Sequence, residues 1–232
     1  MSKTLIFSAT YNEKDNIKEL IEKINQYNKI SDILIIDDNS PDKTGEILKE
    51  LKKKNKNLNY IFREKKSGLD SAHKLAYDFA IKNKYSKLIT MDADLSHDPK
   101  EIPKIIELLD DHEFVIGSRY MEGGNCEMKG LRLLLSIIGN KVIKFILQLK
   151  CNEFTTSYRG FNILKLDNFN LNLVNSKGYS FFMETVYRIS QKGFKVQEIP
   201  INFKNRTKGQ SKIPKIEIFR TLKNLFVLKI FK

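Results

Sequence analysis

The chain has 232 residues, of which 41% are hydrophobic, so it can bury one substantial core and we expect a single domain. Its 41 basic and 28 acidic residues give a net charge of +13, which indicates an anionic partner such as nucleic acid or an anionic membrane surface. It contains no run of about 18 apolar residues and starts directly with a strand pattern, so we expect neither a transmembrane helix nor a secretory signal.

Short apolar segments and helical patterns alternate from the N-terminus. Residues 4–8 predict a first strand, and Ile17, Leu20, Ile21 and Ile24 follow at helical spacing. Further strands are predicted at residues 33–36, 58–62, 87–91 and 114–117, with helices at about 68–81 and 100–109. This order predicts a doubly wound α/β fold over residues 1–120, with a mostly parallel sheet and helices on both faces.

Acidic residues follow two of these strands. Asp37 and Asp38 come after the second, and Asp92 and Asp94 come after the strand at 87–91. Ligands of such sheets bind at the carboxyl ends of the strands. In an extended chain Asp92 and Asp94 would point the same way and form an oxygen site for Mg²⁺ or Mn²⁺. The alternative is two solvated carboxylates or a helix cap before Pro99. We expect His97 at the surface, capping the next helix.

Residues 131–150 predict a helix with polar residues at every fourth position. In one interpretation this is an ordinary amphipathic helix whose polar side faces water. In the other, Arg132 and Ser136 lie one turn apart at a phosphate, and the apolar surroundings guide a lipid tail. The polar positions are Arg132, Ser136, Asn140, Lys144 and Gln148.

The segment from 201 to 232 is strongly basic. It carries nine Lys or Arg residues against the single Glu217, a net charge of +8, interleaved with bulky apolar residues. This pattern is typical of a helix at a membrane interface, although an ordinary surface helix that packs on the core would share it. The interleaved aliphatic residues, and the lack of a recognisable aromatic stacking platform, argue against nucleic acid. The two cysteines, Cys126 and Cys151, have no metal-ligand spacing and favour a reducing cytoplasm.

A series of motifs, in order, resembles the dolichol-phosphate mannosyltransferases, which are inverting glycosyltransferases of family two with the GT-A fold. The similarity covers about residues 4–215, and it departs from the family pattern at Ala9, Ser96, Glu153 and Ser157, where Pro, Gln, Asp and Gly are usual. The motifs are Thr10-Tyr11-Asn12-Glu13, Ile36-Asp37-Asp38-Asn39-Ser40-Pro41-Asp42, Gly68-Leu69, Met91-Asp92-Ala93-Asp94-Leu95-Ser96-His97, Gly117-Ser118-Arg119-Tyr120, Thr155-Thr156-Ser157-Tyr158-Arg159, Gly178-Tyr179-Ser180-Phe181, Glu184, Glu198-Ile199-Pro200 and Phe203 to Lys212.

The resemblance implies roles for individual residues. Asp92 and Asp94 would hold Mg²⁺ or Mn²⁺, and Asp94 and Arg119 would be catalytic. The acceptor phosphate would be bound by Arg119, Arg132 and Ser136, the last two matching the spacing seen in relatives. The nucleotide-sugar donor would be bound by Ala9, Tyr11, Glu13, Asp38, Asp92, Ala93, Asp94, Arg206 and Lys212, with the last two on a loop that closes over the diphosphate.

The implied reaction is metal-dependent, inverting transfer of a hexose onto a polyprenyl phosphate, with mannose from GDP-mannose as the first expectation. The departures leave open UDP-glucose or another donor, undecaprenyl phosphate or a glycan as acceptor, and a non-catalytic binding protein. We expect a GT-A domain over residues 1–212, divided at about 120 into donor and acceptor halves, and a basic amphipathic helix over 213–232. The expected location is cytoplasmic, peripheral on the inner face of the membrane, with no nucleic acid and no obligate protein partner.

Overall fold

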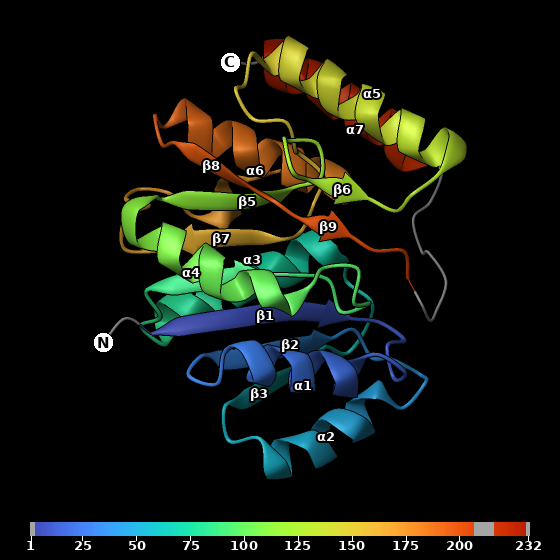
Figure 1. Ribbon diagram of the computed structural model, residues 1–232, viewed down its shortest axis with the longest axis vertical. Helices are drawn as coiled ribbons and strands as arrows, with labels where there is room; N and C mark the ends of the chain where they lie inside the picture. Colours follow the sequence, from blue (N-terminus) through green and yellow to red (C-terminus); the bar gives the residue numbers. More distant parts are fainter. Residues whose placement is uncertain (1–2, 207–215, 231–232) are drawn as a thin grey trace.

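A seven-stranded sheet forms the centre of the computed structural model, which describes residues 3–206 and 216–230 (Figure 1). The strand order is β3-β2-β1-β4-β7-β5-β8, and β7 is antiparallel to both of its neighbours. The other strand pairs of this sheet are parallel. The strands are β1 (Thr4–Thr10), β2 (Asp32–Asp37), β3 (Leu58–Phe62), β4 (Lys87–Thr90), β5 (Phe114–Ser118), β7 (Arg159–Asn162) and β8 (Val196–Pro200).

Helices cover both faces of the sheet because alternate strand residues point to opposite sides. In β1, Leu5 and Phe7 join one apolar cluster and Ile6 joins the other. The cluster around Ile6 is covered by α1 (Ile17–Tyr27), α2 (Thr44–Lys54) and α4 (Ile102–Asp111), which follows the short 3₁₀ helix η1 (Pro99–Glu101). The opposite cluster is covered by α3 (Leu69–Lys82), α6 (Tyr179–Gln191) and the 3₁₀ helix η2 (Leu171–Leu173).

Two further helices lie beyond α6, at the end of the molecule drawn uppermost in Figure 1. They are α5 (Gly130–Leu147) and α7 (Ile216–Ile230), which contact each other, while α7 also contacts α6. A small parallel sheet of β6 (Asn125–Cys126) and β9 (Asn202–Phe203) joins the segment before α5 to the segment after β8. This end of the molecule is therefore tied to the carboxyl ends of β5 and β8.

The predicted α/β class, with a mostly parallel sheet and helices on both faces, is confirmed. The strands β7 and β8 were not predicted from the sequence. β7 is short, with the sequence Arg-Gly-Phe-Asn, and it lacks the apolar run that identifies the parallel strands. It lies in the middle of the sheet because Arg159 is buried there with its guanidinium bonded to the carbonyls of Phe154, Thr156 and Phe182.

Candidate active site

Asp92 and Asp94 lie in a turn immediately after β4, and the expected extended geometry was wrong. The turn forms because Leu95 adopts a left-handed backbone with φ of 62°. The chain then folds back, so that the backbone N–H and the hydroxyl of Ser96 donate to Oδ1 of Asp94 at 3.0 and 2.6 Å. The two carboxylates consequently differ in exposure, with 34% of the Asp92 side chain exposed and only 4% of the Asp94 side chain.

The buried carboxylate of Asp94 forms an ion pair with Arg206 through Oδ2. Burial alone would raise the pKa of Asp94, but the hydrogen bonds from Ser96 and the charge of Arg206 hold that pKa below its usual value. Arg206 is one of the two cations expected on the donor diphosphate. A predicted metal ligand and a predicted donor ligand are thus in direct contact.

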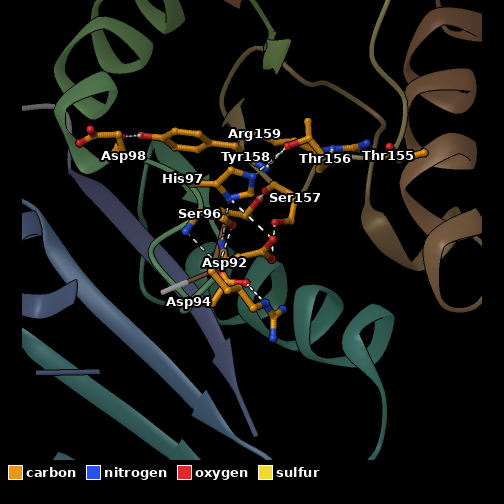
Figure 2. Close-up of polar contacts among 12 residues, drawn as sticks. Asp92, Asp94, Ser96, His97, Asp98, Thr155, Thr156, Ser157, Tyr158 and Arg159 are labelled. Atoms are coloured by element: carbon orange, nitrogen blue, oxygen red, sulfur yellow. Dashed lines mark hydrogen bonds and ion pairs between the residues drawn. The ribbon is translucent and has the colours of Figure 1, made fainter. Parts of the chain in front are cut away.

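The carboxylate of Asp92 is held from a different segment (Figure 2). The hydroxyl of Ser157 donates to Oδ1 at 2.5 Å, and the backbone N–H of Asp92 donates to Nδ1 of His97 at 3.1 Å. Oδ2 has no hydrogen bond to any residue in the described part of the chain. Oδ2 lies 3.8 Å from Nδ1 of His97, and 34% of the Asp92 side chain is exposed, so this carboxylate can be reached from solvent.

His97 is buried, and the expectation that it caps a helix at the surface was wrong. Its ring stacks on Tyr158 at a centroid distance of 5.0 Å, and Nε2 lies 3.2 Å from the hydroxyl oxygen of Thr156. Because Nδ1 accepts from the Asp92 backbone, the neutral ring carries its proton on Nε2 and donates it to Thr156. Burial lowers the pKa of His97, while Asp92 and Asp94 act in the opposite direction.

Arg119, expected at the acceptor phosphate, is buried in an ion pair with Glu153. Its Nε and Nη2 donate to the two carboxylate oxygens at 2.7 and 2.8 Å, and Nη2 also donates to Thr155 at 2.8 Å. Burial alone would raise the pKa of Glu153, but Arg119 holds that pKa below its usual value. Nη1 donates to none of the described residues, which leaves one edge of the guanidinium available.

The other two expected acceptor residues lie on the first half of α5. Ser136 is brought beside Arg119 by the neighbouring Tyr120, whose hydroxyl donates to the Ser136 oxygen at 2.7 Å. Arg132 lies one turn earlier and is exposed. The structure therefore places Ser136 close to Arg119 and leaves Arg132 at the edge of this group.

The side of α5 that faces the protein carries both polar and apolar residues, because Asn140 is buried together with Ile143 and Leu147. The side chain of Asn140 accepts from the backbone N–H of Phe154 at 2.8 Å, and Lys144 donates to Asn152 at 2.7 Å. The interpretation in which the polar residues face water therefore fails at Asn140, although Arg132 is exposed. Much of the apolar surface points outward, with exposed side chains at Leu131, Leu134, Leu135, Ile138 and Phe145.

The residues expected to bind the nucleoside lie at the ends of β1 and β2. Glu13 accepts a hydrogen bond from the side chain of Asn16 at 2.8 Å. The carboxylate of Asp38 pairs with Arg63 and accepts from the backbone N–H of Ser67 at 3.1 Å. Arg63 was not found from the sequence, although its place directly after the third strand was a usable signal.

The aromatic face of Tyr11 is covered in this structure. The Lys66 ammonium lies 4.2 Å from the centre of its ring. Ala9 lies in β1, and Ala93 is buried between the two aspartates. Lys212 falls outside the described residues.

Tyr179, at the start of α6, is a second residue whose place was not predicted. Burial raises its pKa, Asp92 adds to this rise, and Arg206 and Arg132 oppose it. The charges that act on this phenol come from both the expected donor residues and the expected acceptor residues.

Asp92 and Asp94 could supply only some of the ligands that a divalent ion needs. Within residues 3–206 and 216–230, no group of three or more His, Cys, Asp or Glu could hold a metal. The carboxylate oxygens of Asp92 and Asp94 are the ligand type that a divalent ion takes, and in this structure Oδ2 of Asp94 pairs with Arg206 while Oδ2 of Asp92 lies 3.8 Å from Nδ1 of His97. The remaining ligands would have to come from water or from phosphate oxygens.

Comparisons with known proteins agree with the family resemblance seen in the sequence motifs. The chain is 34% identical over 214 residues to a polyprenol monophosphomannose synthase of Mycolicibacterium smegmatis, covering 91% of this chain and 81% of the relative. It is 30% identical to an undecaprenyl-phosphate mannosyltransferase of Micrococcus luteus, covering 91% and 87%. It is 33% identical to a dolichol-phosphate mannosyltransferase of Pyrococcus furiosus, where it spans 97% of this chain but 63% of the relative.

The fold is also shared with solved structures. The mannosyltransferase PcManGT from Pyrobaculum calidifontis, solved with GDP-Man and Mn²⁺, superposes with a TM-score of 0.64 at 15% identity, covering 99% of this chain and 64% of that chain. At that identity the likeness shows the fold alone. The model of the family described as "Glycosyl transferase family 2" matches residues 6–168. The chain belongs to glycosyl transferase family 2 and is a glycosyltransferase.

Proposed function

We propose that this glycosyltransferase transfers mannose from GDP-mannose to a polyprenyl phosphate at a membrane surface. The observation that carries the proposal is the placement of two groups of charged residues at the same edge of the sheet, after the ends of β4 and β5. One is the Asp92–Asp94 turn with Arg206, and the other is the Arg119 group with Ser136 and Arg132. The names of the three relatives supply the substrates, since each is a polyprenyl-type phosphate mannosyltransferase.

On the donor side, Asp92 and Asp94 would hold Mg²⁺ or Mn²⁺ between them. Held there, such an ion would supply positive charge to the diphosphate, which gains negative charge as the glycosidic bond breaks. PcManGT, with the same fold, was solved with Mn²⁺, which supports a divalent ion at this place. Arg206 would leave Asp94 and contact the diphosphate, and Lys212 would add a second positive charge.

On the acceptor side, the open Nη1 edge of Arg119, the Ser136 hydroxyl and the exposed Arg132 would bind the phosphate. A phosphate monoester has its second pKa near about 6, so the attacking oxygen is already ionised at neutral pH. That oxygen forms the new bond to the anomeric carbon while the bond to the departing GDP breaks, which inverts the centre. The chain therefore needs no general base.

The positions of the three histidines support a mechanism that uses no general base. His73 is buried between Phe7 and Phe182, and both ring nitrogens of His97 are engaged. His112 follows α4 at the opposite edge of the sheet. No imidazole is in a position to accept a proton from an acceptor bound at Arg119.

The outward apolar faces of α5 and α7 support a membrane surface. Phe145 on α5 is 84% exposed, and α7 exposes Leu222, Phe226, Val227 and Ile230. No helix in the described part of the chain is long and apolar enough to cross a bilayer. Helices of this kind lie in the interface with their apolar side in the lipid, and nearby cations such as Arg220 and Lys223 attract anionic lipid.

A substrate panel tests the reaction. The protein is incubated with labelled GDP-mannose, UDP-glucose and UDP-GlcNAc, each with a short polyprenyl phosphate and Mn²⁺. We expect product with GDP-mannose, and none when the metal is chelated. Transfer from a UDP-sugar in preference to GDP-mannose would overturn the donor, and full transfer in EDTA would overturn the metal.

Vesicle flotation tests the membrane surface with a matched pair of variants. Phe145→Ser removes an outward residue of α5, and Leu164→Ser removes an exposed leucine after β7, on a different part of the surface. We expect the wild-type protein to bind anionic vesicles more tightly than neutral ones and to lose binding as salt rises. Phe145→Ser should weaken binding, whereas Leu164→Ser should not. Equal loss in both variants would contradict a specific surface.

A further inference from the structure

Ser157 occupies the place where the family pattern has glycine, and its side chain touches the expected metal site. Its hydroxyl donates to Oδ1 of Asp92 at 2.5 Å. Glycine has no hydroxyl and cannot make this bond. The contact is therefore a feature of this chain's own sequence.

The position of that hydroxyl is fixed from β4 itself. The hydroxyl of Thr90, the last residue of β4, donates to the carbonyl oxygen of Ser157 at 2.5 Å. Thr90 precedes Asp92 by two residues, so one short segment sets both ends of the contact. Ser157 is buried, which protects the bond from competing water.

Three other contacts hold the same two segments together (Figure 2). Thr156 contacts the ring of His97, and the hydroxyl of Tyr158 donates to the carbonyl of Asp98 at 2.9 Å. The rings of His97 and Tyr158 also stack. Residue 157 therefore lies between two segments that these contacts hold together, and its hydroxyl is held toward Asp92.

We infer that Ser157 is a positioning residue for the divalent ion of the proposed function. By donating to Oδ1 of Asp92, its hydroxyl would restrain rotation of the carboxylate, so that Oδ2, which accepts no hydrogen bond from the described residues, would be the oxygen offered to the ion. Groups that orient a metal ligand in this way typically change metal affinity by about 10- to 100-fold when they are removed. The inference rests on the proposed metal site and adds to it a residue that sets the affinity.

The test measures Mn²⁺ affinity in the presence of saturating GDP, from the signal of free Mn²⁺ in electron paramagnetic resonance. Ser157→Ala and Ser157→Gly should each raise the Mn²⁺ dissociation constant about tenfold. The second variant restores the family residue and is therefore compatible with the fold. GDP binding without metal should stay at the wild-type value, because the hydroxyl acts on the nucleotide only through the ion. Transfer should fall at low Mn²⁺ and recover at saturating Mn²⁺.

The matched control is Thr185→Val, which removes another buried hydroxyl, one that bonds within α6 to the carbonyl of Phe181 at 2.8 Å. It should leave Mn²⁺ affinity unchanged. Mn²⁺ affinity within twofold of wild type in both Ser157 variants would overturn the inference while leaving the proposed site intact. Absence of Mn²⁺ binding in the wild-type protein would overturn both. A loss of activity that saturating Mn²⁺ does not restore would show a structural role only.

Discussion

The helices α1 and α5 both carry polar and apolar residues at helical spacing, but only α1 buries its whole apolar side. In α1 the apolar residues Ile17, Leu20, Ile21 and Ile24 are all fully buried. In α5 the polar Asn140 is buried, and apolar residues such as Phe145 are exposed. Periodicity therefore predicts that a helix has two sides, but it does not determine which side the protein covers.

The difference follows from what each helix packs against. The sheet face under α1 is apolar, so burying apolar side chains there is favourable. The segment under α5 offers the backbone N–H of Phe154, the amide of Asn152 and the hydroxyl of Tyr120, which need polar partners. These polar partners hold Asn140 and Lys144 toward the protein, and a large part of the apolar surface of α5 is left exposed.

The largest effect should come from the aspartate turn that follows the apolar sheet. Asp92→Asn or Asp94→Asn should reduce transfer on the order of 10³-fold, because metal stabilisation is worth several kcal/mol. Both variants should fold, because Asn keeps the size of the Asp side chain and can still accept hydrogen bonds through its amide oxygen. Asp167→Asn, at an exposed carboxylate outside the site, is the control. Transfer assays beside thermal melts check this, and near-normal transfer by both site variants would contradict it.

The buried ion pair between Arg119 and Glu153 should show the next largest effect. Glu153→Gln leaves the buried Arg119 charge unpaired and should cost about 3–5 kcal/mol of unfolding free energy. The folded-state pKa of Glu153 is lowered, so its contribution is present above the usual carboxyl pKa and is lost as pH falls through the lowered value.

Denaturant unfolding from pH 7 to pH 3 checks this prediction. The difference between wild type and Glu153→Gln should shrink toward the acid end of the range. Glu153→Asp, which restores the family residue, should cost less because it keeps a carboxylate beside Arg119. A difference that stays constant with pH would contradict the ion pair as its source.

The contrast between the two helices can be tested directly by a pair of truncations. Leu20→Ala in α1 should cost about 2–5 kcal/mol, because it leaves a cavity under a fully buried residue. Phe145→Ala in α5 should change stability by less than about 0.5 kcal/mol, because its side chain is 84% exposed. Denaturant unfolding measures both. A cost of several kcal/mol for Phe145→Ala would show that the Phe145 side chain packs against the protein.

The smallest expected effect distinguishes Arg132, proposed to bind the acceptor, from Arg206, proposed to bind the donor. Arg132→Ala should raise KM for the polyprenyl phosphate roughly 10-fold and leave GDP affinity unchanged, since a hydrogen bond to a charged group is worth about 1.5–3 kcal/mol. Arg206→Ala should instead weaken donor binding or turnover, because Arg206 lies at Asp94. Steady-state kinetics and calorimetry distinguish them. Loss of GDP binding by Arg132→Ala with normal acceptor kinetics would reverse the roles.

Most of the fold could be predicted from the sequence because its parallel strands are buried on both faces and read as apolar runs. The aspartate turn could be placed at the end of β4 for the same reason. The exposed side of α5, the burial of His97 and the ion pair of Arg119 with Glu153 could not. Each depends on a partner distant in the sequence, such as Phe154 for Asn140 or Thr156 for His97.

Two charged or polar partners in the site were missed for a related reason. Arg63 reaches Asp38 only because β2 and β3 are neighbours, and Tyr179 acts at the site because α6 begins beside the aspartate turn. A motif search identifies residues that share a local pattern. It does not identify a side chain that arrives from another element to neutralise or orient them.

Arg132 and the outward face of α5 belong to the same helix, and this has a kinetic consequence. In the proposed function, a protein held on a bilayer by α5 would have Arg132, the residue proposed to bind the acceptor phosphate, at the level of the lipid headgroups. Attachment to the surface and binding of the acceptor would then be two linked contacts, each weak alone. Once the first has formed, the second forms at a high effective concentration. Search for the acceptor becomes lateral diffusion in two dimensions, with the enzyme aligned before each encounter.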